Sequence, residues 1–178
     1  MRTLKIFGWL SHFLWASMLL LTIFFGILVY SEFTTTYSES WFIEFMGKEI
    51  HTDSQKTYLL TFMVLCFGIY VLYFYAITLF NLCVRKFEKR IFFDLSIIKR
   101  FKIIGIIFIT NYIVILILGK IFSIHSAKEI TSSTDFSTSV LEKLDSPLGS
   151  LIIGFFFLVL SQVFKEALKQ KQENELTI

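Results

Sequence analysis

The sequence predicts an all-α integral membrane protein whose four transmembrane helices form an antiparallel up-down bundle, with an amphipathic cytoplasmic segment before the third helix. Four long apolar stretches alternate with polar segments. Hydrophobic residues make up 55% of the chain, its mean hydropathy is +0.69, and only 17% of its residues are charged. A water-soluble protein of 178 residues could not bury so much apolar surface, so lipid must cover it.

The first predicted span covers residues 6–30, and its central block from Leu19 to Val29 carries no charge. At about 1.5 Å per residue it is longer than the roughly 30 Å hydrocarbon core, so some tilt is expected. A signal peptide is the alternative, because Arg2 and Lys5 precede the apolar run. The run is too long for one, and the residues after Val29 do not form a small-residue cleavage site, so we favour a retained anchor.

The other predicted spans cover residues 58–84, 101–124 and 147–164, and all four belong to one membrane domain over residues 1–178. Helices are expected because lipid offers no partner for unpaired backbone groups. The fourth span is the shortest, but its start is well marked. Asp145 or Ser146 can cap it, and Pro147 suits the first helical position because its missing N–H would have no intrahelical acceptor.

The orientation follows from the basic residues, twelve of the 17 lying in the N-terminal segment, the loop at 85–100 with the start of the third span, and the tail at 165–178. The outer loops at 31–57 and 125–146 hold most of the acidic residues. By the positive-inside rule both termini and the middle loop face the cytoplasm. We therefore expect a multi-pass membrane protein with both termini in the cytoplasm.

The middle loop is expected to lie on the membrane surface as an amphipathic helical hairpin. Its apolar residues recur at spacings of three and four, at Phe87, Ile91, Leu95, Ile98 and Phe101. Asp94 can cap the helix that leads into the third span. Seven basic residues are candidates for binding anionic lipid or a partner, each worth about 1 kcal/mol near an anionic leaflet: Arg85, Lys86, Lys89, Arg90, Lys99, Arg100 and Lys102. The simpler alternative is that they only determine topology.

Polar residues within the spans are few. Tyr70 and Tyr73 lie at about the same depth as Asn111, so we expect a hydroxyl–amide contact between the second and third spans. Ser150 and Gly154 form a small-xxx-small pair that lets a helix approach closely, within the bundle or, alternatively, across a dimer. Gly68, Gly105 and Gly119 occur singly and support no further inference.

The sequence points to no catalytic residue, cofactor or metal site. Mid-membrane charges and broken helices, which are typical of coupled transporters, do not occur in the spans. His51, Asp53 and His125 do not follow the spacing of a closed zinc site. Cys66 and Cys83 lie about 25 Å apart if they share one helix, too far for a disulfide. His12 is expected to be a packed or interfacial histidine. We therefore expect no enzymatic activity.

The segment from Arg85 to Gly105 resembles the middle loop of a small bacterial four-span membrane family known as domain of unknown function 2975. The residues that carry the resemblance are Phe93, Asp94, Lys99, Arg100, Lys102 and Gly105. Ser146–Pro147–Leu148 and the terminal stretch Glu173–Ile178 are also similar to members of that family. The chain departs from the pattern before Phe93, where Ile91 and Phe92 replace small or basic residues.

The resemblance implies a role without established activity, and members are often encoded beside a small helix-turn-helix transcription regulator. The expected function is therefore that of a non-enzymatic, regulatory or partner-binding component of the inner membrane. Its expected partners are membrane lipids, a cytoplasmic transcription regulator or another membrane protein, with a homo-oligomer also conceivable and no direct contact with nucleic acid. The alternative is a small transporter, channel or immunity-type membrane protein.

Overall fold

The computed structural model describes residues 2–34, 53–129 and 148–176, and every regular element in these ranges is an α-helix. The helices are α1 (Arg2–Thr34), α3 (Asp53–Glu88), α4 (Leu95–Glu129) and α6 (Leu148–Leu176). Each is long and apolar enough to cross a membrane. The predicted fold class, an all-α protein with four spans, is confirmed.

Each helix continues past the span that the sequence predicts. The predicted spans at 6–30, 58–84 and 101–124 lie inside α1, α3 and α4, and residues 148–164 lie inside α6. The candidate capping residues Asp145, Ser146 and Pro147 lie outside the described residues. The central parts of the outer loops, 35–52 and 130–147, also lie outside them.

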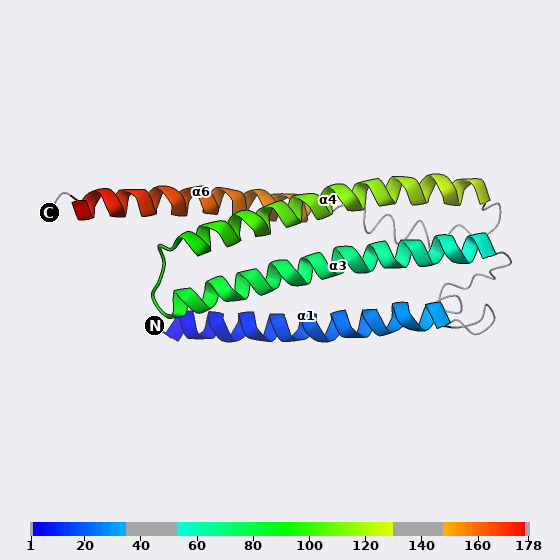
Figure 1. Cartoon of the computed structure of the whole chain (residues 1–178), viewed down its shortest axis with the longest axis horizontal. Coiled ribbons are helices and arrows are strands. Elements are labelled where there is room, and N and C mark those ends of the chain that lie inside the picture. Colours follow the sequence, from blue (N-terminus) through cyan, green and yellow to red (C-terminus); the bar gives the residue numbers. More distant parts are fainter. Residues whose placement is uncertain (1, 35–52, 130–147, 177–178) are drawn as a thin grey trace.

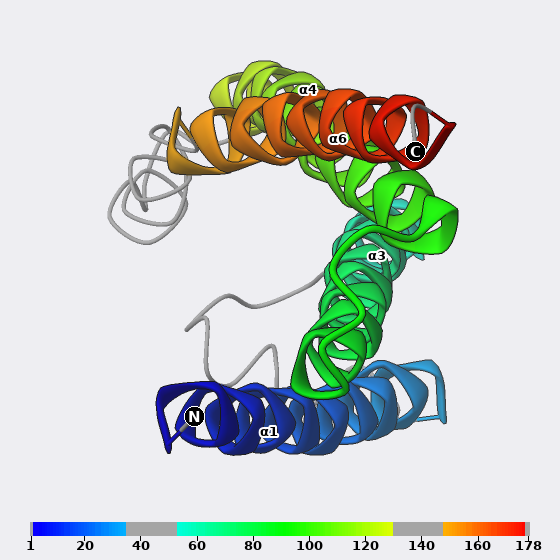
Figure 2. The same cartoon turned by 90° about the vertical axis from the view of Figure 1, so that its left-hand side faces the viewer.

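Successive helices run in opposite directions, as expected for an up-down arrangement (Figure 1). Viewed from one end, α3 lies in the middle, with α1 on one side and the pair of α4 and α6 on the other (Figure 2). The first turns of α1, the connection from α3 to α4 and the last turns of α6 lie at the same end of the molecule (Figure 1). We call this the basic end, because it carries the twelve basic residues of the three predicted cytoplasmic segments.

The seam between α4 and α6 is closed by two glycines. A Cβ atom added to Gly105 would lie 2.8 Å from the carbonyl oxygen of Gly154, and one added to Gly154 would lie 3.1 Å from the carbonyl oxygen of Gly105. The two backbones therefore touch. Gly154 therefore packs within the bundle. Of the two alternatives for the small-xxx-small pair, packing within the bundle or across a dimer, the structure has the first. The sequence alone supported no inference about Gly105, because its partner lies on a distant segment.

Serine hydroxyls extend this seam in both directions from the glycines. Ser161 donates to the carbonyl oxygen of Ile98 at 3.1 Å, and Ser150 donates to that of Phe108 at 3.1 Å. These bonds fix the register of the two helices: α6 begins beside the stretch from Phe108 to Asn111, about halfway along α4. The second half of α4 therefore extends beyond the start of α6.

The seam between α1 and α3 contains more polar contacts. The indole of Trp15 donates to the Thr78 hydroxyl at 3.1 Å. The amide of Asn81 donates to the carbonyl oxygen of Ser11 at 3.4 Å, and both residues are buried. Packing of Phe25 against Phe67 closes the far part of the seam. The first helix is thus bound to α3 along most of its length.

A cluster of phenylalanines joins α3, α4 and α6 near the basic end. Phe101 is only 2% exposed, and its ring lies 5.6 Å from that of Phe157 and 5.5 Å from that of Phe164. Phe87 packs against both Phe101 and Phe164, and Phe157 also contacts Phe80 and Phe108. Aromatic pairs of this kind favour edge and offset arrangements. The cluster packs against the buried core formed by α3 and α4.

The amphipathic segment before the third span is built from the ends of two long helices. Its residues divide among the last turn of α3, a connection at 89–94 and the first turns of α4. The expected apolar stripe is divided accordingly, because Ile98 and Phe101 are buried whereas Ile91 and Leu95 are exposed. The 3.6-residue spacing holds only within one helix, and this stripe crosses a turn.

Candidate functional site

The connection from α3 to α4 is a defined turn. The N–H of Arg90 donates to the carbonyl oxygen of Phe87 at 2.9 Å, and the N–H of Ile91 donates to that of Lys86 at 3.0 Å. This is the Schellman pattern that ends many helices. Arg90 takes the left-handed conformation, with φ at 60°, where glycine is the usual residue. The turn determines where the basic residues on both sides of it lie.

Asp94 caps the start of α4, as the sequence predicted. Its carboxylate accepts the N–H of Ser96 at 2.9 Å and pairs with the ammonium group of Lys86. The hydrogen bond from Lys86 lowers the pKa of Asp94, and the bond from the Ser96 amide lowers it further. Lys86 also donates to the Ser96 hydroxyl. Lys86 is therefore committed to joining the two helices across the turn.

Replacing Asp94 with alanine should lower the free energy of unfolding by about 1–2 kcal/mol, because the change removes both the cap and the ion pair. Because the folded-state pKa lies below the ordinary carboxyl value, the ion pair contributes stability above about pH 4. That contribution is lost as the pH falls through the lower folded-state value. Thermal unfolding in detergent from pH 7 downward measures this loss. Asp94→Asn keeps the cap and should not show the same loss, so an identical acid response in that variant would contradict the assignment.

Two of the predicted arginines are also engaged inside the molecule. The Nε of Arg85 donates to Nε2 of His12 at 3.1 Å, and Nδ1 of His12 lies 2.8 Å from the carbonyl oxygen of Gly8. An arginine only donates and a carbonyl only accepts, so Nδ1 carries the proton in this arrangement. Arg100 donates to the carbonyl oxygen of Leu82 at 3.2 Å. Arg85 thus binds α3 to α1, and Arg100 binds α4 to α3.

The seven predicted basic residues therefore divide into two groups. Arg85, Lys86 and Arg100 hold helices together, which sequence reasoning missed because their partners are a histidine, a capping carboxylate and a backbone carbonyl. The side chains of Lys89, Arg90, Lys99 and Lys102 are exposed. Of these, Lys89, Lys99 and Lys102 form the part of the predicted site that remains open to a ligand.

The last turns of α6 project beyond the connection as an exposed helix (Figure 1). Every side chain from Lys169 to Leu176 is exposed. Lys169 pairs with Glu173 and Lys171 pairs with Glu175, both at 3.7 Å and at the helical spacing of four residues. Such pairs support an isolated helix by a few tenths of a kcal/mol each. We call residues 169–176 the α6 extension. The chain end at residues 177–178 lies outside the described residues.

The second predicted group, Tyr70, Tyr73 and Asn111, does join helices, but not through a hydroxyl–amide bond. Tyr70 donates to the sulfur atom of Met18 at 3.3 Å, and the Tyr73 hydroxyl lies 3.0 Å from Oγ of Ser150. Asn111 donates to the carbonyl oxygen of Ile69 at 3.4 Å. The predicted contact rested on the equal depth of these residues in the membrane. Equal depth does not determine the direction in which each side chain points around its helix. Because Ser150 donates to α4, Tyr73 completes a three-helix polar junction.

Replacing Asn111 with leucine should leave stability unchanged or raise it by about 1 kcal/mol. The bond to Ile69 is long, and an interhelical bond of this kind averages about 0.6 kcal/mol. The carbonyl oxygen of the Asn111 side chain is buried without a partner among the described residues, which costs about 1–3 kcal/mol. Unfolding in mixed detergent micelles measures the change, with Asn111→Ala as a cavity-forming control that should destabilise. A clear loss of stability in the leucine variant would show that the amide has a partner.

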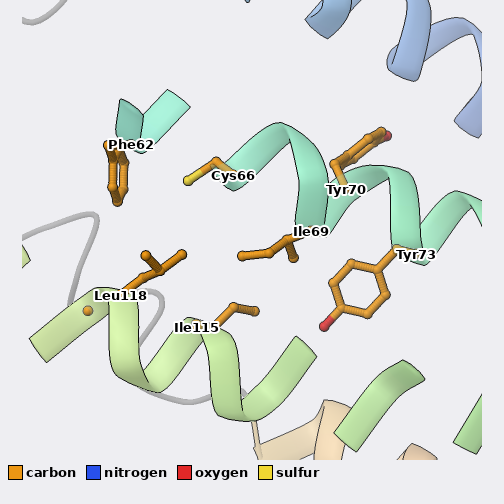
Figure 3. Close-up of a pocket in the computed structure, with 8 residues that line it drawn as sticks. Phe62, Cys66, Ile69, Tyr70, Tyr73, Ile115 and Leu118 are labelled. Carbon is orange, nitrogen blue, oxygen red and sulfur yellow. The ribbon is translucent and has the colours of Figure 1, made fainter. Parts of the chain in front are cut away.

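A cavity of about 210 Å³ lies between α3 and α4 on the far side of the three-helix junction from the basic end (Figure 3). It is lined by Phe62, Cys66, Ile69, Tyr70, Tyr73, Ile115, Leu118 and Gly119. This is the part of α4 that extends beyond the start of α6. The lining is almost wholly apolar, so the cavity suits a hydrocarbon chain rather than an ion.

The other candidate groups in the sequence are metal-binding side chains and two thiols. The described residues contain no group of three or more histidine, cysteine or acidic side chains that could hold a metal ion. Cys66 and Cys83 are free thiols within α3. The candidate metal-binding loop residue His51 lies outside the described residues, and nothing is described of the side chains of Asp53 and His125.

Comparison with known proteins identifies a family without an assigned activity. No curated protein and no solved structure matches the chain. The family described as "Protein of unknown function (DUF2975)" matches over residues 2–178, which is nearly the whole chain. The match agrees with the resemblance seen in the residues around Asp94 and Gly105. The protein is thus a member of the DUF2975 family of membrane proteins with four helices able to span the bilayer.

Proposed function

We propose that this protein is a non-enzymatic component of the bacterial inner membrane that binds a regulatory protein partner at its cytoplasmic face. The observation that carries the proposal is the α6 extension. It stands clear of the bundle, and all its side chains are exposed (Figure 1). An exposed helix gains little stability from its own propensity, so contacts with a partner are the natural source of further stabilisation.

The charges of the extension suit a protein rather than a lipid surface. Lys169 and Lys171 are each followed four residues later by a glutamate, so the two signs nearly cancel. A net basic helix would be drawn to anionic headgroups, whereas a mixed pattern suits a complementary protein helix. The exposed Leu176 adds an apolar contact at the far end.

The proposed orientation places the basic end in the cytoplasm. The first turns of α1, the α3–α4 connection and the α6 extension share one end, and that end is rich in lysine and arginine. The positive-inside rule supports this orientation. A reporter fused after Ile178 that is active only in the cytoplasm is the expected result, and periplasmic activity would overturn it.

Site-specific photo-cross-linking in native membranes tests the proposal. A photoreactive residue at Gln172, in the extension, should capture one defined protein species. The same residue at Gln162, which is exposed on the membrane-spanning part of α6, is the matched control and should not capture it. The double variant Lys171→Glu with Glu175→Lys keeps the pair and the net charge but inverts the pattern, and should reduce capture about tenfold.

Other outcomes would redirect the proposal. Equal capture from both positions, or capture unaffected by charge inversion and by deletion of residues 173–178, would mean that the extension is not a docking element. Solute or ion flux into liposomes that contain the protein, well above that of empty liposomes, would instead favour a channel or transporter. The four predicted spans contain no acidic residue and only two basic ones, Lys102 and Lys120, which is why coupled flux is not expected.

A further inference from the structure

The charged residues at the basic end reach different depths in the membrane on different helices. On α6 the last charged residue before the apolar span is Lys165, and on α3 it is Arg85. On α4 charged residues continue to Lys102. If the three helices were aligned at these charged residues, Lys165, Arg85 and Lys102 would lie at the same membrane depth. The contacts between the helices show whether they are aligned in this way.

The contacts place the α4 lysines deeper than this boundary. Ser161 lies one helical turn deeper in the membrane than Lys165, and it donates to the carbonyl oxygen of Ile98. Lys102 follows Ile98 by one more turn into the membrane. Lys102 therefore lies roughly 12 Å below the level of Lys165. The close approach of Gly105 and Gly154 requires the same offset. The bond from Asn111 to Ile69 places Lys102 roughly 10 Å below Arg85. Lys99 lies about one turn less deep.

Lys99 and Lys102 face away from the neighbouring helices. Both are exposed, they lie three residues apart on one face, and no hydrogen bond or ion pair joins either to another described residue. Arg100, between them, is instead held by the carbonyl oxygen of Leu82. Their face continues into a stripe of exposed isoleucines at Ile103, Ile106, Ile113 and Ile117. Two ammonium groups thus lie at the head of an apolar stripe that faces lipid.

We propose that Lys99 and Lys102 form a specific site for an anionic phospholipid. Its phosphate binds between the two ammonium groups and one acyl chain lies along the stripe from Ile103 to Ile113. A charge at this depth is costly unless the side chain reaches toward the surface or a counter-charge comes to it. An anionic diester supplies the counter-charge and fills the apolar stripe at the same time. A zwitterionic lipid brings its own cation, and free phosphate has no acyl chain.

This site is independent of the proposed protein partner, since it uses α4 and not the α6 extension. The test is native mass spectrometry of the whole protein in neutral detergent during titration with phosphatidylglycerol, phosphatidylcholine or inorganic phosphate. Wild-type protein should retain phosphatidylglycerol in preference to the other two. The double variant Lys99→Gln with Lys102→Gln should bind it about thirty-fold more weakly, from the usual contribution of two basic residues.

Two control variants show whether such a loss is specific. Lys169→Gln with Lys171→Gln makes the same change in net charge on the α6 extension and should bind like wild type. Lys99→Arg with Lys102→Arg should keep most of the affinity. Equal loss in both glutamine pairs would mean that only net charge matters and would overturn the site. Unchanged binding in the Lys99/Lys102 glutamine pair, or equal retention of phosphatidylcholine or phosphate by wild type, would overturn it as well.

Discussion

Replacing Gly105 with alanine should lower the free energy of unfolding by about 2–3 kcal/mol, the upper part of the range for overpacked sites. The new Cβ would lie 2.8 Å from the carbonyl oxygen of Gly154, a backbone atom that cannot move without shifting α6. Leu158 is equally close on the same helix. The change should therefore separate α4 from α6 and weaken the serine bonds on either side of the glycines.

The matched control is Gly68→Ala on α3, where an added Cβ meets nothing within 4 Å. That variant should be at least as stable as wild type, because alanine favours the helix. Unfolding by sodium dodecyl sulfate, followed by circular dichroism, compares the two. If both variants unfold at the same detergent fraction, α4 and α6 do not make the close approach described here. Loss of α6 packing should also reduce the proposed cross-linking from Gln172, because the same helix carries the extension.

Features that depend on a single helix could be predicted from the sequence. Apolar length predicts a span without knowledge of any neighbour, because lipid is the partner. The cap at Asp94 was also predictable, since a capping carboxylate binds an amide two residues away. Charge asymmetry likewise predicted which segments share one end of the molecule, and α1, the connection and α6 do so.

Features that depend on the register between helices could not be predicted from the same patterns. Gly105 looked unremarkable alone, and only its contact with Gly154 gives it a role. Asn111 was expected to find a tyrosine hydroxyl because both lie mid-span, yet it reaches a backbone carbonyl, which no side-chain pattern reports. Arg85, Lys86 and Arg100 were counted with the exposed lysines because a sequence shows charge but not the partner. The depth of Lys102 is a register property of the same kind.

Phe101 tests whether the phenylalanine cluster holds α3, α4 and α6 together at the basic end. Replacing it with alanine should lower the free energy of unfolding by about 2–3 kcal/mol. Loss of a buried phenylalanine costs about 3–5 kcal/mol in water-soluble cores, and less is expected here because an unpacked side chain returns to lipid, not to water. What remains is the lost packing against Phe87, Phe157 and Phe164.

The contrasting variant is Phe155→Ala on α6, which removes the same ring from a side chain that is 54% exposed. If burial against neighbouring rings is what matters, Phe155→Ala should change stability by less than about 0.5 kcal/mol, as is usual at exposed positions. Equal losses at the two positions would mean that the cluster contributes no more than any apolar surface facing lipid. A selective loss at Phe101 would instead show that packing between these rings holds the helices together beside the turn at Arg90. Because that turn and the start of α4 present Lys99 and Lys102, Phe101→Ala should then also weaken retention of the anionic lipid, although no lysine has been changed.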